Sequence, residues 1–169
     1  KRNIVKQNTV NEQISDLEDA LRESQMGDGT GPNAAFRGLF DLLPDAVLIN
    51  RNNDIVFANA AAADLYGADG AEDLIGISTR IFIHPDDLEA VNKRQRTMLA
   101  EGERAPLLAQ RRIRLDGQVV DVEVAVTPIT WEGERSILVV SRDISERRKT
   151  EMALRETEER IKNISANLP

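Results

Sequence analysis

The chain has 169 residues, of which 41% are hydrophobic and 30% are charged, with a formal net charge of −7 at pH 7. This length suits one ordinary domain with a single core plus additional helix. The acidic balance argues against a general nucleic-acid surface, and the lack of an apolar run of about 18 residues argues against a membrane span.

The residue types limit the chemistry. The sequence has no cysteine and one histidine. The lack of cysteine excludes disulfides, cysteine nucleophiles and cysteinyl cofactor adducts, and fits a reducing cytoplasm, where we expect the chain to reside. A single histidine excludes a multi-histidine metal site, and we predict neither a metal site nor catalytic residues. Because the chain starts at Lys1 rather than Met, we expect it to be part of a longer protein.

Residues 3–25 are predicted to form a helix with one apolar seam. The seam consists of Val10, Ile14, Leu17 and Leu21, at spacings of 4, 3 and 4 residues. This spacing is typical of a coiled coil. We interpret residues 1–26 as a linker helix whose seam contacts a partner helix in a dimer. The alternative is an amphipathic helix that packs on its own domain.

Two short strands, residues 46–50 and 55–58, flank the turn-rich sequence RNND and are predicted to form a hairpin. Asn59 stands where a helix N-cap belongs, before residues 60–66, and Gly67 suits the end of that helix. Further along, Pro85 and the two aspartates that follow it suit the start of another helix.

The last third of the chain alternates as β-strands do. Residues 107–115 and the valines that follow are separated by Asp116-Gly117, a strong hairpin signal. One face of the second strand carries Val120, Val122, Val124 and Val126. Such alternation predicts an antiparallel sheet with one face buried. Glu132-Gly133 predicts another turn, before a last strand at residues 135–142.

A long polar helix is predicted from Ser145 to about Ile164, roughly 30 Å in length. Its heptad core positions are Arg147, Thr150, Leu154, Thr157, Ile161 and Ile164. Because only half of them are apolar, we expect a weak, adjustable dimer seam that includes Leu154 and Ile161.

Two self-similarities link the ends of the chain. DLEDALRES (16–24) resembles KTEMALRET (149–157), and AFRGLFDLLP (35–44) resembles RIKNISANLP (160–169). We therefore expect one unit of a tandem array, with a similar domain following it.

The combination of LFDLLPDAVLINRNNDIVFANAAAADLYG (39–67), IHPDDLEAV (83–91), RRIRLDGQVVDVEVAVTPI (111–129) and SRDISERRKTE (141–151) resembles the PAS sensory domain. The resemblance implies an α+β fold, in which a five-stranded antiparallel sheet carries short helices that frame a cavity on one face. Coiled-coil-like helices would flank residues 34–145 at both ends, with residues 146–169 as the output helix. The usual hosts are bacterial sensor histidine kinases and cyclic-di-GMP enzymes.

The sequence RDIS resembles the family's Asp-Ile-Thr signature at the junction of the last strand and the output helix. Asp143, Ile144 and Ser145 are therefore our candidates for signal relay. Ser145 can cap the helix, and Asp143 can accept hydrogen bonds near its N-terminus. No Gly or Pro separates strand from helix, so the junction can transmit a tilt or a rotation.

No cofactor of the family can be assigned. The resemblance requires a cysteine for a flavin adduct or a coumaroyl chromophore, and a histidine for haem on the helix at residues 88–100, and neither is present. For His84 we favour a loop residue that orders the helix start over a haem ligand or phosphoacceptor. The apolar pocket candidates are Ile49, Phe57, Leu65, Leu88, Val124 and Val139, which suit a small apolar ligand or a filled core.

Two further expectations concern large side chains. Trp131 adjoins the Glu132-Gly133 turn and is predicted to be an exposed hairpin-end aromatic. Arg111, Arg112 and Arg114 are predicted to form a solvated face. Taken together, the sequence favours a sensor and homodimerisation module that relays a signal to adjacent PAS or effector domains. The alternative is a ligand-free structural spacer.

Overall fold

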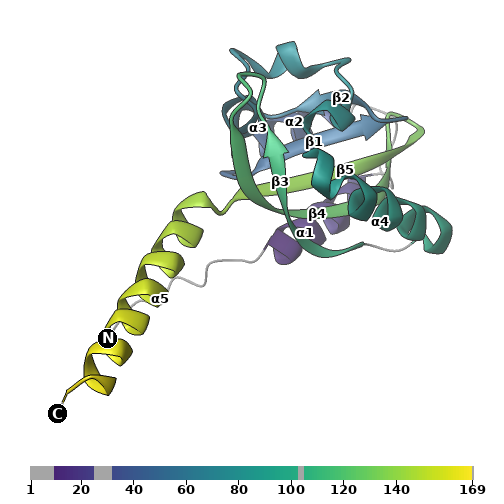
Figure 1. Cartoon of the computed structure of the whole chain (residues 1–169). Coiled ribbons are helices and arrows are strands. Elements are labelled where there is room, and N and C mark those ends of the chain that lie inside the picture. Colours follow the sequence, from purple (N-terminus) through teal and green to yellow (C-terminus); the bar gives the residue numbers. More distant parts are fainter. Residues whose placement is uncertain (1–9, 25–31, 103–104, 169) are drawn as a thin grey trace, which may run out of the picture.

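The computed structural model of the chain describes residues 10–24, 32–102 and 105–168. A five-stranded sheet lies at its centre, in the order β2-β1-β5-β4-β3, and all neighbouring strands are antiparallel (Figure 1). The strands are β1 (Ala46–Arg51), β2 (Asp54–Ala58), β3 (Ala105–Ile113), β4 (Val119–Trp131) and β5 (Glu134–Asp143). The α-helices are α1 (Val10–Ser24), α2 (Pro32–Asp41), α3 (Ala60–Tyr66), α4 (Leu88–Glu101) and α5 (Ser145–Ala166). Three short 3₁₀ helices are η1 (Ala71–Leu74), η2 (Thr79–Phe82) and η3 (Pro85–Asp87). The predicted α+β fold is confirmed.

Residues with left-handed backbone close the three hairpins. Asn52 and Asn53, between β1 and β2, have φ values of 53° and 74°. Gly117 has φ 84°, and the turn between β4 and β5 has Glu132 at 52° and Gly133 at 79°. Asn and Gly adopt this conformation more readily than other residues, which is why these sequences favour turns. All three predicted hairpins are confirmed.

The sheet is covered on both faces. We call the face covered by α3, η1, η2 and α4 the inner face, and the face covered by α1 and α2 the outer face (Figure 1). Strand β4 shows the alternation: Val122 and Val124 are buried on the inner face, and Ala125 and Trp131 on the outer face. The predicted burial of the valine face is confirmed, and the opposite face is buried as well.

The predicted seam of the N-terminal helix does not lie at a dimer interface. Val10, Ile14 and Leu17 are at most 8% exposed and pack on the outer face of their own sheet, in one cluster with Val47 and Leu138. The alternative reading, a helix packed on its own domain, is the correct one for these residues. The side chain of Leu21 lies outside the described residues. The N-terminal helix packs on its own sheet because β1 and β5 are apolar at consecutive positions, so both faces of these strands need to be covered.

The prediction of an exposed Trp131 is wrong for the same reason. Its side chain is buried and lies 5.7 Å from the ring of Phe57 and 6.0 Å from that of Phe40, between ring centroids. Trp131 ends β4 on the outer face, which α1 and α2 cover. Trp131 is buried although it lies next to a turn, because its position in the strand directs its side chain toward the covered outer face.

Helix α5 extends away from the sheet (Figure 1). Every side chain from Glu146 to Leu168 is exposed. Among the described helices, none has the combination of length and apolar character that would let it cross a membrane.

Candidate functional site

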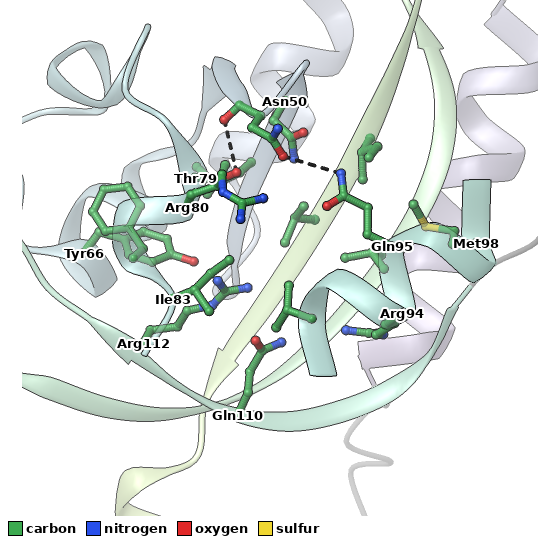
Figure 2. A pocket seen from close by; sticks show the side chains of 17 residues that line it. Asn50, Tyr66, Thr79, Arg80, Ile83, Arg94, Gln95, Met98, Gln110 and Arg112 are labelled. Atoms are coloured by element: carbon green, nitrogen blue, oxygen red, sulfur yellow. Dashed lines mark hydrogen bonds between the residues drawn. The ribbon is translucent and has the colours of Figure 1, made fainter. Parts of the chain in front are cut away.

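A cavity lies between the inner face of the sheet and the segment formed by η2 and α4 (Figure 2). Its volume is about 70 Å³. The apolar part of its wall includes Leu48 of β1, Val126 of β4, and Ile137 and Val139 of β5. Because four strands and the helices α3, η2 and α4 contribute to the wall, a change in the cavity's contents would affect most of the sheet.

Of the six predicted pocket residues, only Val139 lines this cavity. Leu65 and Val124 belong to the inner-face core without reaching the cavity, and Leu88 is half-buried outside it. The predictions for Ile49 and Phe57 are wrong, because both side chains lie on the outer face. The reason is that AVLI in β1 is apolar at every position, so a period of two does not reveal which residues point inward.

The polar part of the wall was missed. Arg112 and Gln110 of β3 are 6% and 5% exposed and line the cavity, so the prediction of a solvated position is wrong for Arg112, and Gln110 was not predicted at all. Their strand partners are Val120 and Val122, which lie on the inner face. Cross-strand partners share a face, so carrying the valine assignment across the Asp116-Gly117 turn would have identified both residues.

These two polar side chains are incompletely paired within the protein. Among the described residues, neither amide atom of Gln110 has a hydrogen-bond partner, and Nε of Arg112 has none. No described Asp or Glu lies within ion-pair distance of Arg112. Unpaired polar groups at this depth are few in native proteins, and each costs about 1–3 kcal/mol.

Arg94 of α4 adds a second, half-buried guanidinium. Its Nη2 donates to the carbonyl oxygens of Val124, at 2.8 Å, and of Pro106. Burial lowers the pKa of Arg94 to about 10, with repulsion from Arg112 as the lesser cause. Arg80 also lines the cavity and donates to Asn92 Oδ1 at 3.2 Å. Among the described residues that line the cavity there is no Asp or Glu, so its electrostatic character is cationic.

His84 has the structural position that we predicted. Its Nδ1 accepts a hydrogen bond from the backbone N–H of Asp86 at 3.2 Å and thereby caps η3. At the other end of η3, Asp87 accepts from Arg111, with Oδ1 3.0 Å from Nη2, and this bonding lowers the pKa of Asp87. In the described parts of the chain, no three His, Asp or Glu side chains come together as a metal site.

The second candidate site is the junction of β5 and α5. Asp143 Oδ1 accepts from the backbone N–H of Ser145 at 2.8 Å. Ile144 is buried, and its N–H donates to the carbonyl oxygen of Asp121 at 2.9 Å. Ser145 is the first residue of α5 rather than its cap, so the predicted capping by Ser145 is wrong and Asp143 supplies the local hydrogen bond.

Two ion pairs hold the first turn of α5 against β4. Arg147 Nη2 lies 2.5 Å from Glu123 Oε1, and Arg148 Nη1 lies 2.7 Å from Asp121 Oδ1. Both pairs are partly exposed, so each contributes at most about 1 kcal/mol. The start of α5 is therefore attached to the sheet by polar contacts that can rearrange at low cost.

Comparisons with known proteins agree with this architecture. The family model described as PAS fold matches residues 34–144. The chain is 31% identical over 114 residues to Sporulation kinase A of Bacillus subtilis (strain 168), covering 68% of this chain and 19% of that protein. It is 29% identical over 139 residues to the Methyl sulfide methyltransferase-associated sensor of Methanosarcina acetivorans, covering 81% of this chain and 13% of that protein.

The chain thus spans about a fifth or less of the length of these two relatives. Among solved structures, it is similar to the PAS domain of a protein from Colwellia psychrerythraea, with a TM-score of 0.59 and 22% identity. That match covers 67% of this chain and 97% of the other.

Proposed function

Because the chain belongs to the PAS family, we propose that it is a regulatory sensor module that relays a signal from its cavity through α5 to an effector. The effector we propose is a histidine kinase or a cyclic-di-GMP enzyme on the same, longer protein. One relative is a kinase and the other a sensor, which supports a signalling role. We propose no catalytic step for the module itself, and its cytoplasmic location stays a prediction from the cysteine-free sequence.

The observation that carries this proposal is that the cavity and the start of α5 share two strands. Val139 of β5 lines the cavity, and Asp143 ends the same strand four residues later. Val126 of β4 also lines the cavity, while Asp121 and Glu123 of β4 hold the first turn of α5. A ligand that shifts these strands would change the direction of α5, because no flexible loop separates β5 from the helix.

We propose that residues 34–145 form the sensor and that residues 146–169 form an output helix leading to an adjacent PAS or effector domain. The output helix would also dimerise the protein. Leu154 and Ile161, seven residues apart on α5, are 60% and 58% exposed, and a second copy of the helix would cover them. Val10, Ile14 and Leu17 of the N-terminal helix are not part of the proposed interface, since they are already buried in their own domain.

A ligand-free dimerisation spacer is the second candidate. It is favoured by the cavity volume of about 70 Å³, which is well below the several hundred Å³ of a typical ligand site. The side-chain atoms of Gln110 and Arg112 that have no partner among the described residues favour the sensor, because such groups destabilise a core that binds no ligand.

The relay is tested with Asp143→Ala, and Asp116→Ala is the matched control. Both aspartates accept from the backbone N–H two residues ahead, Asp143 at 2.8 Å and Asp116 at 3.0 Å, but Asp116 lies in the β3–β4 hairpin. Each variant loses one such hydrogen bond, so both should lose a similar, small amount of stability. Effector activity of the full-length protein that carries these residues should change with Asp143→Ala alone. Equal changes in activity would reduce Asp143 to a stabilising residue.

A further inference from the structure

The cavity contains polar groups that the protein leaves without partners. Figure 2 shows Gln110 and Arg112 extending from β3 into the space between the sheet and α4. Both residues are more than nine-tenths buried, and three of their side-chain atoms have no hydrogen-bond partner. Two of these atoms are N–H donors, Nε2 of Gln110 and Nε of Arg112, and both belong to residues that line the same cavity. Their natural complement is an acceptor supplied from outside the chain.

The positive charge of the cavity indicates that this acceptor is negatively charged. Arg80, Arg94 and Arg112 line it, and the described lining residues include no carboxylate. Arg94 has backbone carbonyl oxygens as acceptors, whereas Arg112 has no counter-ion in the part of the chain that the structure describes. A buried cation without a partner is costly, and burial, with repulsion from Arg112 as the lesser cause, already lowers the pKa of Arg94. An anion in the cavity would relieve both costs.

Size and apolar lining define the rest of the ligand. A volume of about 70 Å³ is well below the several hundred Å³ of a typical ligand site, which suits a molecule of few non-hydrogen atoms and is too small for a flavin, a haem or a nucleotide. The part of the wall beside β3, on β4 and β5, is apolar, with Val126, Ile137 and Val139. A planar carboxylate matches the fork of an arginine and an adjacent amide donor, and a short hydrocarbon chain matches the apolar wall.

We propose that the cavity binds a small carboxylate with a short apolar tail, with Arg112 and Gln110 holding the carboxylate and Val126, Ile137 and Val139 contacting the tail. This ligand assignment rests on the proposed sensor function. It names the chemical class to which the sensor responds.

Titration calorimetry and thermal unfolding of the whole chain test the assignment, with sodium butyrate as the probe. Butyramide is the neutral control of the same shape, and sodium sulfate is the control for an anion without a tail. We expect butyrate to bind and to raise the unfolding temperature, with weaker or undetectable binding of both controls. Equal binding of butyramide would show an apolar cavity without charge selectivity and would overturn the proposal. Equal binding of sulfate, or no binding of butyrate, would overturn it too.

Variants assign the binding to the proposed residues. Arg112→Met should weaken butyrate binding about 10- to 100-fold, because a charge-assisted hydrogen bond is lost. Arg135→Met, at an exposed position of β5, is the matched control and should bind as the unaltered chain does. Gln110→Met should weaken binding about 3- to 10-fold and serves as a second variant if the first does not fold. Unchanged affinity in a folded variant of Arg112 or Gln110 would remove that residue from the site and refute the assignment.

One further measurement separates a ligand-binding arginine from a structural one. Without ligand, Arg112→Met should leave the unfolding temperature unchanged or raise it, since it removes an unpaired buried charge. A large fall would indicate a structural role and count against the proposal. Failure of the butyrate test together with altered effector output in Asp143→Ala would reject the ligand class and leave the relay standing. Butyrate binding together with unaltered effector output in Asp143→Ala would reject the relay and leave the ligand class standing.

Discussion

The loss of stability on replacing Asn59 can be worked out from its hydrogen bonds. It is completely buried and makes four hydrogen bonds that join α2, β1 and α3. Its Oδ1 accepts from the backbone N–H groups of Val47 and Ala62, each at 2.9 Å. Its Nδ2 donates to the carbonyl oxygens of Phe40 at 2.8 Å and Asp45 at 3.0 Å. The predicted N-cap is therefore also a connection between three elements.

Replacement by alanine would not expose all four partners equally. The N–H of Ala62 also donates to the Asn59 carbonyl oxygen at 3.1 Å, and the Phe40 carbonyl also accepts from Leu43 at 3.2 Å. Asn59→Ala would therefore leave mainly the N–H of Val47 and the carbonyl oxygen of Asp45 without a hydrogen-bond partner. At about 2 kcal/mol for each buried group left without a partner, Asn59→Ala should cost about 4 kcal/mol. For a domain of this size that corresponds to a fall in unfolding temperature of about 10–20 °C.

Chemical denaturation monitored by circular dichroism measures this free energy, with the exposed Asn163→Ala on α5 as the matched control. Asn59→Asp separates the cap from the full network. It keeps the acceptor for Val47 and Ala62 but turns a carboxylate oxygen toward two carbonyls. We expect a large loss of stability at pH 7 as well.

Burial beside carbonyl oxygens should raise the pKa of the new aspartate above that of the unfolded chain. Its destabilising effect should therefore shrink as the pH is lowered toward about 4, where the carboxyl becomes protonated in both states. A cost below about 1 kcal/mol for Asn59→Ala, or a neutral Asn59→Asp at pH 7, would refute the reasoning.

Three further outcomes are expected. Leu154→Glu combined with Ile161→Glu should lower the mass of the protein in solution, measured by light scattering, because like charges would meet on the proposed α5 seam; an unchanged mass would exclude that interface. Ile14→Ala should cost about 2–4 kcal/mol in denaturant unfolding, independent of protein concentration, because Ile14 is fully buried within its own domain; a concentration-dependent cost would instead place it between subunits. Asp87→Asn should remove a stabilisation of about 1 kcal/mol, since Arg111 lowers the pKa of Asp87. That stabilisation is fully present above the ordinary pKa of 3.8 and is lost as the pH falls through the lowered value, so equal unfolding free energies of both proteins at pH 7 would contradict it.

The candidate sites could be predicted only in part. The junction residues Asp143 and Ile144 carry a local signal, the direct passage from a β-branched strand to a charged helix, and the structure gives both of them defined contacts. The burial of Gln110 and Arg112 can be predicted only from their partners on the other strand of the hairpin. A charged residue in an edge strand usually faces water, and here the register with Val120 overrides that tendency.

The sequence by itself determined what depends on neighbours along the chain. Asn52, Asn53 and Gly117 specify turns because few other residues accept positive φ, and Asn59 specifies a helix start through its own side chain. The alternating valines of β4 specify which of its residues share a face. These features follow from backbone sterics and from the period of the strand.

Only the tertiary structure decided what depends on a partner elsewhere in the chain. The apolar stripe of α1 fits a second helix or a sheet equally well, and the second apolar face of the sheet decided in favour of the sheet. Leu48 and Ile49 are both apolar, so the cover on each face, rather than the strand itself, decided that Leu48 lines the cavity. Hydrophobic burial has no direction of its own, and a residue's surroundings are therefore settled only when all the faces that compete for it are in place.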